Sequence, residues 1–374
     1  METSHTNVTH LFKNYFPKTP GGIEEAIRQI GKFSLKNGYS VKVISVSKIP
    51  FEGKLDGIIC KSFYHSFGSN SLPVSIDLLR NFKNIIDNTD LLHLHFPWPT
   101  IELMTLLFNV KKPIVITFHC EIHNQKFLQT LYKPILKELF RKAKIIVPTS
   151  ERLMNSTSIL SAFKNKCRSI NLWLDEERFL SLPSPDEIFR TEVNKFGNYC
   201  LFVGVLRWYK GLDILLDAAK TIIGNIVIVG KGPLLEKLKK RVEIERIKNV
   251  CLLGFQSDEN VKFLIQKSRF IILPSISPAE AFGQVLLEAS FFSKPMVTTE
   301  LGTGTSFVNL NNETGYVVEP SDIICLSESC NILFGNNNLV EKFGQNANNR
   351  YLENFTEDIQ GLKYIEIYST LLGI

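Results

Sequence analysis

The stretch FIILPSISPAEAFGQVLLEASFFSKPMVTT, residues 270–299, contains a complete strand–helix–strand unit. An apolar run over Phe270–Leu273 is followed by a loop, by a segment of helical period over Val285–Phe292, and by a second short run over Met296–Thr298. Buried strands that alternate with helices are typical of parallel βαβ units. The stretch therefore predicts an α/β fold built on a parallel sheet.

The same alternation extends over the rest of the chain, whose 374 residues are enough for two such domains. The other strands are expected at Val8–Phe12, Ser40–Val46, Gly57–Cys60, Asp90–His95, Ile114–His119, Lys144–Val147, Tyr199–Val203, Ile226–Val229 and Val250–Leu253. The other helices are expected at Gly22–Lys36, Lys126–Lys142, Gly211–Ala219 and Leu234–Ile247. We therefore expect two Rossmann-like domains that face each other across a cleft.

A segment without clear periodicity separates the two predicted domains. Residues 181–197 carry Pro183, Pro185 and several charges, which is typical of a linker. We expect a first domain over residues 1–180 and a second over 198–357. A last helix at 358–372 is expected to pack back on the first domain.

Composition and cysteine usage favour a soluble cytoplasmic protein. Hydrophobic residues make up 44% of the chain and charged residues 21%, and no window has the roughly 18–20 uninterrupted apolar residues of a membrane span. The N-terminal METSHTNVTH lacks the apolar stretch of a signal peptide. The seven cysteines contain no Cys-x-x-Cys pair, which favours a reducing compartment and disfavours structural zinc.

The net charge of +6 is unevenly distributed. Up to Asp175 the chain holds 23 Lys and Arg against 13 Asp and Glu, and the remainder holds 20 against 24. The predicted helix 126–142 carries Lys133, Lys137 and Arg141 as a basic stripe. The excess of positive charge in the first half suits an anionic partner, either nucleic acid or an anionic membrane that carries a lipid-linked acceptor. A solvated, lysine-rich face is the alternative.

Two carboxylates stand out in the opening stretch. Glu280 falls in the loop after the first strand, and Glu288 lies eight positions later, inside the helix. The two lie on the order of 10 Å apart, and one could bind sugar hydroxyls while the other binds a ribose. Phe282, Gly283 and Gln284 open the helix with free amides, which is a natural seat for a phosphate. A pair of ordinary surface glutamates is the alternative.

Cations and glycines follow two other strands of the second half. The segment FVGVLRWYKG (202–211) places Arg207 and Lys210 after a strand, where two cations can neutralise a diphosphate. A solvated pair at a helix start is the alternative. VGKGPLLEKL (229–238) has Gly232 before a helix, a form that suits a loop in contact with a nucleotide.

Paired glycines and histidines mark strand ends in the first half. Gly21 and Gly22 open a helix, where free amides suit a phosphate; a tight turn without a ligand is the alternative. His119 closes the strand IVITFH, where its imidazole can hydrogen-bond a sugar or acceptor, and a buried packing histidine is the alternative. We expect His93 and His95, which end the preceding strand, on opposite faces, with His95 nearer the ligand.

These segments together resemble the retaining glycosyltransferases of family four, which have the two-domain GT-B fold. PSISPAEAFGQVLLEASFFSKPMVTT is similar to the family's Glu-x7-Glu signature, and GGIEEAIRQIG, ITFHC, FVGVLRWYKGLDILLDA, VGKGPLLEKL and LGF match in order over essentially the whole chain. Two features depart from the usual pattern. The arginine that normally follows the glycine is displaced to Arg207, and ELGTGTS (300–306) stands where the family has a Gly-Gly turn.

The resemblance implies a role for each of these positions. Glu280 would hold the hydroxyls of the donor sugar and Glu288 the ribose, while the backbone before Phe255 would read the base. The implied catalytic residues are His119, Arg207, Lys210 and Glu280. The implied donor-binding residues are Gly21, Gly22, Arg207, Lys210, Gly232, Phe255, Glu280, Phe282, Gly283, Gln284 and Glu288.

Within the family, HFPWP, GGIEE and GTGTS look most like bacterial O-antigen mannosyl- and rhamnosyltransferases. The likeness implies GDP-mannose as the donor, a glycan or lipid-linked acceptor of surface polysaccharide synthesis, and work at the inner face of the membrane. No Asp-x-Asp occurs near these segments, so no metal cofactor is expected. Retention is expected through front-face attack.

Two other functions compete with this interpretation. A nucleotide-sugar epimerase of the same fold is disfavoured by the Glu280 and Glu288 pair. A nucleic-acid-binding protein that uses the basic half is disfavoured because the chain has no recognition-helix motif and no aromatic residues interleaved on a basic strand.

Overall fold

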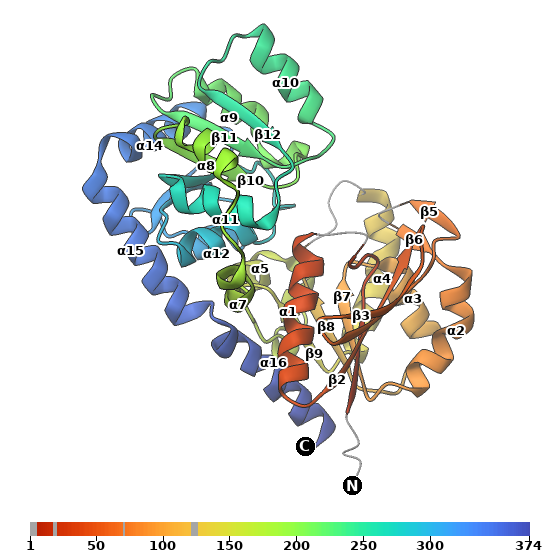
Figure 1. Cartoon of the computed structure of the whole chain (residues 1–374). Helices are drawn as coiled ribbons and strands as arrows, with labels where there is room; N and C mark the ends of the chain where they lie inside the picture. Colours follow the sequence, from red (N-terminus) through yellow and green to blue (C-terminus); the bar gives the residue numbers. More distant parts are fainter. Residues whose placement is uncertain (1–5, 18–20, 70–71, 121–125) are drawn as a thin grey trace. The chain divides into compact units, whose positions relative to one another are not determined.

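The computed structural model describes residues 6–17, 21–69, 72–120 and 126–374, with the side chains of 126–131 outside that description. The chain divides into two compact units (Figure 1). One unit consists of Met1–Trp173 together with Glu357–Ile374, and the other of Leu174–Thr356. Each unit has a sheet and helices of its own.

The main sheet of the first unit has seven strands among the described residues, in the order β3-β4-β2-β1-β7-β8-β9. Neighbouring strands are parallel except for the edge pair β3–β4. The strands are β1 (Asn7–Leu11), β2 (Ser40–Ser47), β3 (Phe51–Leu55), β4 (Ile58–Tyr64), β7 (Leu91–Phe96), β8 (Ile114–Phe118) and β9 (Ile145–Pro148), with a separate hairpin of β5 (Phe67–Ser69) and β6 (Leu72–Val74). The helices are α1 (Gly22–Lys36), α2 (Ile76–Asp87), α3 (Pro99–Leu107), α4 (Lys126–Lys142), α5 (Glu151–Ser156), α6 (Ser158–Ser161), the 3₁₀ helix η1 (Lys164–Lys166) and α16 (Glu357–Leu372).

The central strands of this sheet are buried on both faces. Every residue of β7 and of β8 is buried, although β7 contains two histidines. One apolar cluster includes Leu94 and Phe118, and a second includes Val8, Ile27 and Trp173. Strands covered on both sides need nearly continuous apolar runs, which is the pattern that made them recognisable in the sequence.

The last helix, α16, completes the core of the first unit by packing on α1. The two helices approach closely at Gly361, where an added Cβ would lie 2.6 Å from the Phe33 ring. Tyr364 and Tyr368 of α16 are buried, and their hydroxyls reach polar side chains of the sheet. The C-terminal residues are therefore part of the fold of the N-terminal sheet.

The second unit, whose residues are all described, has a six-stranded sheet in the order β12-β11-β10-β13-β14-β15, with every neighbouring pair parallel. The strands are β10 (Tyr199–Val203), β11 (Asn225–Val229), β12 (Val250–Gly254), β13 (Phe270–Leu273), β14 (Met296–Thr299) and β15 (Gly315–Val318). The helices are α7 (Glu176–Ser181), α8 (Glu187–Asn194), the 3₁₀ helix η2 (Trp208–Lys210), α9 (Leu212–Ala219), α10 (Leu235–Ile244), α11 (Asp258–Lys267), α12 (Gln284–Phe291), α13 (Thr305–Val308), α14 (Ile323–Gly335) and α15 (Asn337–Asn354).

A glycine joins the ends of three neighbouring strands in this unit. Gly230, after β11, has a φ of +142°, and an added Cβ would lie 1.8 Å from the carbonyl oxygen of Gly204, which follows β10. The Gly230 amide donates to the carbonyl of Gly254, the last residue of β12, at 2.7 Å. The loops after β10, β11 and β12 are therefore held in contact by backbone alone.

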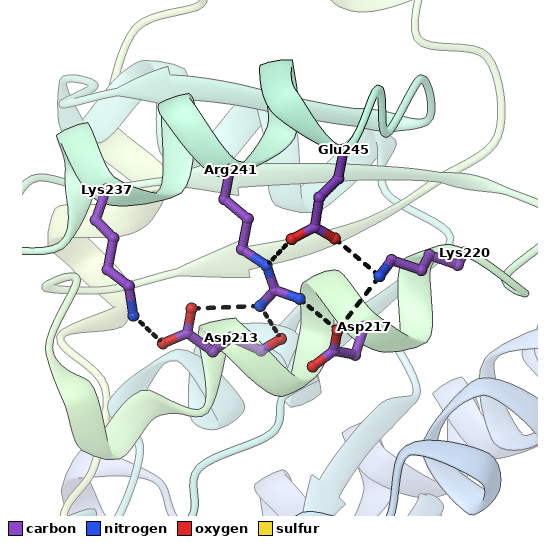
Figure 2. Close-up of polar contacts among 6 residues, drawn as sticks. All are labelled: Asp213, Asp217, Lys220, Lys237, Arg241 and Glu245. Carbon is purple, nitrogen blue, oxygen red and sulfur yellow. Dashed lines mark hydrogen bonds and ion pairs between the residues drawn. The ribbon is translucent and has the colours of Figure 1, made fainter.

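An ion-pair network joins α9 to α10 (Figure 2). Its members are Asp213, Asp217, Lys220, Lys237, Arg241 and Glu245. Arg241 is central, since its Nε donates to Glu245 at 2.6 Å and its Nη1 donates to the Asp213 carbonyl at 2.8 Å. Hydrogen bonds from Arg241 and Lys220 lower the pKa of Glu245 to about 2. Such a network holds two helices together more firmly than an isolated surface pair.

The predicted α/β class with two largely parallel sheets is confirmed, and the predicted strands agree with the structure to within a few residues. The structure adds β3, β5, β6 and β15, which the sequence did not predict. Residues of β3 alternate between half-buried and exposed, because an edge strand lacks the continuous apolar run of a central one. Helix α8 lies inside the segment 181–197. No helix in the described ranges is both long and apolar enough to cross a membrane.

Candidate functional site

Two neighbouring parallel strands of the second unit, β10 and β13, deliver the loops that carry the main candidates. The loops are locked together by Gly211, whose φ is +68° and whose added Cβ would lie 1.9 Å from the Pro274 carbonyl oxygen. In addition, the Ile276 amide donates to the Tyr209 carbonyl at 2.8 Å. Because only glycine fits at 211, the chain approaches β13 closely enough to place Lys210 beside the loop of Glu280.

Lys210 and Glu280 form an ion pair that is almost entirely buried. Their residues are 8% and 7% exposed, and the Lys210 ammonium contacts the Oε2 atom of Glu280. Ser275 donates a hydrogen bond to the same oxygen at 3.0 Å. A buried charge needs such partners, because removing it from water costs several kcal/mol that an isolated charge cannot recover. The pair is thus a preformed polar centre at the carboxyl ends of β10 and β13.

Arg207 lies three residues before Lys210 in an extended backbone conformation, at the start of η2. Its side chain is exposed, in contrast to the buried Lys210. The structure therefore gives the two predicted cations different environments, with Lys210 fixed by Glu280 and Arg207 at the surface.

The residues between Glu280 and α12 present unused backbone donors. The amides of Phe282, Gly283 and Gln284 donate to no residue within the described part of the chain. Gly283 is the N-cap of α12 with a φ of +77°, and an added Cβ would lie 2.8 Å from Leu273. A glycine is therefore needed for the turn that exposes these amides at the positive end of the helix dipole.

The Phe282 side chain is buried and anchors this turn. The Phe282 ring lies 6.3 Å from the Phe355 ring, and an added Cβ on Gly304 would lie 2.5 Å from the Phe282 ring. The Gly304 amide donates to Ala281 at 2.8 Å, and the Thr303 hydroxyl donates to the Glu280 carbonyl at 2.8 Å. The segment 300–306, which stands where the family has a Gly-Gly turn, thus packs directly against the Glu280 loop.

Glu288 is half-buried on α12, four residues after Gln284. The helix rise places it about 6 Å further along the axis than Gln284. One loop and the helix that follows it therefore carry Glu280, the free amides and Glu288 in that order.

The loops after β11 and β12 lie beside the loop of β10. Gly232 has a φ of +159°, and an added Cβ would lie 2.6 Å from the backbone nitrogen of Leu206. The Leu206 amide donates to the Lys231 carbonyl at 3.0 Å. Phe255 is 66% exposed, and the Lys231 ammonium lies 4.8 Å from its ring centroid. The cation–π contact between Lys231 and Phe255 joins the loop after β11 to the loop after β12.

In the first unit, Gly21 is the N-cap of α1 and Gly22 its first residue. An added Cβ on Gly21 would lie 2.4 Å from the Glu24 carboxylate, which is itself buried. Glu24 and Glu25 both occupy the first turn of α1. Carboxylates stabilise this end of a helix, so an anion that binds at Gly21 and Gly22 must do so beside them.

His119 follows β8 and is 3% exposed, next to a row of buried histidines. The Nε2 atom of His119 lies 3.0 Å from the Nδ1 atom of His95, whose Nε2 lies 2.9 Å from the Nδ1 atom of His10. His93 bonds Tyr368 and Thr117 instead, at 2.6 and 2.7 Å.

The expectation that His93 and His95 face opposite sides of the sheet is wrong. Their rings stack with centroids 4.4 Å apart, because residues two apart on a strand point to the same face. Burial lowers the pKa of all four histidines, to about 3 for His10 and His119. The four imidazoles are therefore neutral at pH 7.

With this geometry established, comparison with known proteins identifies the chain. Residues 20–176 match the model of "Glycosyltransferase Family 4", and residues 184–350 match that of "Glycosyl transferases group 1". The O-antigen chain mannosyltransferase C of Escherichia coli is 34% identical over 98% of this chain and 98% of its own. This chain belongs to glycosyltransferase family 4. The D-rhamnosyltransferase WbpZ of Pseudomonas aeruginosa is 33% identical to this family 4 glycosyltransferase over 93% of the present chain and 92% of the relative.

Solved structures show that the glycosyltransferase has the GT-B fold. Anabaena Alr3699/HepE in complex with UDP and glucose superposes with a TM-score of 0.80 at 17% identity, covering 98% of this chain and 100% of that one. WaaG, a glycosyltransferase involved in lipopolysaccharide biosynthesis, superposes with a TM-score of 0.71 at 17% identity, covering 96% of this chain and 99% of WaaG. At these identities the likeness concerns the fold alone.

The glycosyltransferase has one buried acid that the sequence analysis missed. Glu102, on α3 just after β7, is 2% exposed, and burial raises its pKa to about 8. Its Oε1 atom accepts from the Trp98 amide at 2.7 Å, while Oε2 is buried and bonds no residue in the described part of the chain. The signal was a single acid inside the apolar run PTIELMTLL. A carboxyl that is largely protonated at pH 7 can donate a hydrogen bond at this edge of the sheet.

Among the described residues, one group of side chains has the spacing of a metal site. Ligand atoms of His10, His93 and His95 lie within 4.8 Å of one another. In the present structure, however, His95 stacks on both His10 and His93, and all three rings are already hydrogen-bonded.

Proposed function

We propose that this glycosyltransferase transfers mannose from GDP-mannose to a glycan or lipid-linked acceptor of surface polysaccharide synthesis, with retention of anomeric configuration. The support is the name of the Escherichia coli relative, an O-antigen chain mannosyltransferase, and its 34% identity over nearly the full chain. The observation that carries the proposal is the buried Lys210–Glu280 pair, in which Glu280 lies on the same loop as the free amides before α12.

Each group of the second unit has a place in this scheme. The Glu280 carboxylate accepts hydrogen bonds from sugar hydroxyls, and the Glu288 carboxylate accepts them from the ribose. The diphosphate lies at the amides of Phe282, Gly283 and Gln284. The loops at Gly232 and Phe255 meet the nucleoside, where backbone groups read the base.

The cations serve the bond-breaking step. Negative charge builds up on the diphosphate as the bond between it and the sugar breaks, and fixed donors aimed at that charge lower the barrier. Lys210 and Arg207 supply two cations for this purpose, and the amides before α12 supply neutral donors. His119 and the Gly21–Gly22 turn of the first unit contact the sugar or the acceptor. The scheme uses no metal cofactor.

A thermal-shift panel tests the donor. GDP-mannose at about 100 times its Kd should stabilise the protein by about 2.7 kcal/mol, which raises Tm by roughly 2–4 °C. UDP- and ADP-sugars at the same concentration should shift Tm less. Stabilisation by UDP-sugars alone would remove GDP-mannose as the donor.

Product analysis with labelled GDP-mannose then separates transfer from epimerisation. The expected product carries the label on an acceptor glycan. Label that appears only in a 2-epimer of the donor would mean that the enzyme is an epimerase.

We further propose that the first unit binds the cytoplasmic face of an anionic membrane. Lys133, Lys137 and Arg141 of α4 are exposed, as the basic stripe requires. The neighbouring apolar residues Leu139 and Phe140 are buried in the core instead of facing lipid. Apolar contacts would come from α3, which packs on α4 and leaves Leu103 and Leu107 exposed.

The apolar side chains proposed to contact the membrane lie toward the end of α3. Leu103, Leu107 and Phe108 are 41%, 70% and 42% exposed, and Lys142 of α4 donates to Asn109 beside them at 3.0 Å. Basic and apolar groups that adjoin in this way suit an interfacial site. The protein should sediment with vesicles of anionic lipid and not with zwitterionic ones. Lys133→Glu/Lys137→Glu should abolish sedimentation, and unchanged binding would rule this surface out.

A further inference from the structure

Three buried histidines form a hydrogen-bonded row that ends at the carboxyl edge of the first unit's sheet. The row runs from His10 on β1 through His95 on β7 to His119 after β8, with nitrogen–nitrogen distances of 2.9 and 3.0 Å. Successive rings stack with centroids 5.2 and 5.3 Å apart. Because the three strands are neighbours in the order β1-β7-β8, the row crosses the sheet from its centre toward His119.

The number of protons along this row limits it to two arrangements. Each imidazole is neutral at pH 7 and so carries one ring proton, and each link needs one N–H and one lone pair. Both links join an Nδ1 atom to an Nε2 atom. The position of the proton on His95 therefore decides both neighbours. Either all three rings carry hydrogen on Nδ1, or all three carry it on Nε2.

The two ends of the row differ, and the difference selects one arrangement. The Nε2 atom of His10 is buried and has no partner among the described residues. The Nδ1 atom of His119 also bonds no described residue, but it is not among the fully buried atoms that lack a partner. In folded proteins a buried N–H without an acceptor is rarer than a buried acceptor without a donor. The arrangement with hydrogen on every Nδ1 leaves only a lone pair buried at His10.

We propose that His10 and His95 are positioning residues that fix His119 in the Nδ1–H tautomer, with this N–H available to a ligand as a hydrogen-bond donor. The identity of the ligand rests on the proposed function, in which the ligand atom is a hydroxyl oxygen of the transferred sugar or of the acceptor. In the opposite tautomer the same atom would offer a lone pair and could accept a proton. The row thus makes His119 a hydrogen-bond donor and not a base.

His93 does not compete for a place in the row. Both of its ring nitrogens are engaged, one by Tyr368 and the other by Thr117, which itself lies 3.1 Å from the Tyr364 hydroxyl. A shared metal ion is the other use for such a cluster, but ligand nitrogens must then converge on one point. The stacked rings direct their nitrogens along the row.

Nitrogen NMR on the full chain labelled with ¹⁵N-histidine tests the tautomers directly. Spectra that correlate ring nitrogens with carbon-bound ring protons at pH 7.5 distinguish Nδ1–H from Nε2–H, and single substitutions assign the signals. His10, His95 and His119 are expected to show a protonated Nδ1 and a bare Nε2. Substitution His65→Asn, outside the row, should change none of these signals.

Two substitutions at the middle of the row test the coupling. In His95→Asn the amide nitrogen can replace the Nδ1 donor, so His119 should keep its tautomer and the enzyme its kcat/KM for the donor. In His95→Leu the donor is lost, so His119 should show a mixture of tautomers. Loss of the fixed N–H should lower kcat/KM about tenfold, the size of one neutral hydrogen bond.

Several outcomes would overturn the inference. In the wild type, the outcomes are unlike tautomers among the three rings, or hydrogen on every Nε2. In folded His95→Leu, the outcome is an unchanged His119 tautomer. Stoichiometric zinc in the purified protein would also overturn it. Should circular dichroism show that His95→Leu is unfolded, the wild-type pattern and His95→Asn still decide the question. The NMR result needs no sugar transfer. A protein with the expected tautomers that binds no nucleotide sugar would retain this inference and lose the proposed function.

Discussion

The Lys210 ammonium and the Glu280 carboxylate, 70 residues apart in sequence, form an ion pair that is withdrawn from solvent at the ends of β10 and β13. Neither charge has enough other partners to remain buried alone, since Ser275 provides the only other side-chain hydrogen bond to the Glu280 carboxylate among the described residues. The pair fixes the conformation of both loops before any donor binds. In a glycosyltransferase this preorganisation means that little structural change is needed when charge develops on the leaving group.

Replacing one partner of this pair should cost much more stability than replacing both. Lys210→Met leaves a buried, uncompensated carboxylate, and we expect a loss of about 3 kcal/mol in the free energy of unfolding. Lys210→Met/Glu280→Gln should recover most of that loss. Urea unfolding of the two single variants and the double variant gives the coupling energy. Additive effects would show that the pair does not act as a unit.

The same variants should separate stability from catalysis. All three are expected to lose sugar transfer, because the double variant restores neutrality but not the groups that face the donor. Glu280→Ala and Glu288→Ala should each weaken donor binding. Unchanged donor affinity and turnover in either alanine variant would contradict the assigned roles.

Glu102 should make the protein less stable as pH rises through the neutral range. Its folded pKa of about 8 is above the ordinary value of 4.5, so the folded state holds the proton more tightly than the unfolded one. The resulting stability is fully present below pH 4.5 and is lost between pH 4.5 and 8, at up to about 1.4 kcal/mol per pH unit.

Glu102→Gln removes this dependence while it keeps an acceptor for the Trp98 amide. Relative to wild type, the variant should therefore gain stability from pH 6 to pH 8 in urea unfolding. Parallel pH profiles for the two proteins would show that Glu102 is ionised in the folded state.

The four buried histidines should make the protein sensitive to acid. Their folded pKa values are below the ordinary value of 6.5, reaching about 3 for His10 and His119, whereas the unfolded chain binds protons near 6.5. Stability is therefore complete above pH 6.5 and is lost as pH falls toward 3. Each histidine contributes up to about 1.4 kcal/mol per pH unit.

A single substitution should remove one of the histidines that set the slope of unfolding free energy against pH. His93→Gln removes one of the four titrating rings, and the dependence of unfolding free energy on pH between 6.5 and 5 should become shallower by a quarter of the histidine contribution. Equal slopes for His93→Gln and wild type would mean that the cluster is protonated in the fold.

Arg241 should contribute measurably to the stability of the second unit. Its side chain is 19% exposed and bonds acidic groups of both α9 and α10, so Arg241→Met should cost about 1–2 kcal/mol. The exposed pair of Lys239 and Glu236 offers a control, since Lys239→Met should change the unfolding free energy by less than about 0.5 kcal/mol. Donor binding should be retained in both variants, and a similar cost at both positions would contradict a special role for the network.

The sequence predicted the elements whose signal is local. The apolar runs of β7, β8, β10 and β13 are continuous because these strands are buried on both faces, and the glycines at 211 and 283 stand where the chain must turn from strand to helix. The strand β3 escaped prediction because one of its faces meets solvent. The opposite-face expectation for His93 and His95 misapplied the period of two, which places both on one side.

Charge pairing between distant residues could not be derived from the same patterns. Lys210 and Glu280 each fitted a role toward a ligand, and nothing in the sequence indicated that they also bind each other. Glu102 had a visible signal, an acid in an apolar helix, but its pKa depends on how completely the surrounding core excludes water.

By itself, the sequence determined the α/β class, the positions of the central strands and of several helices between them, and membership of glycosyltransferase family 4, because strand and helix periods and the Glu-x7-Glu spacing are local properties of the chain. Only the tertiary structure decided that Lys210 lies on Glu280, that α16 closes the core of the N-terminal sheet, and that His10, His95 and His119 form one hydrogen-bonded row. Those relationships depend on which strands become neighbours and on how deeply their side chains are buried. Long-range packing sets both.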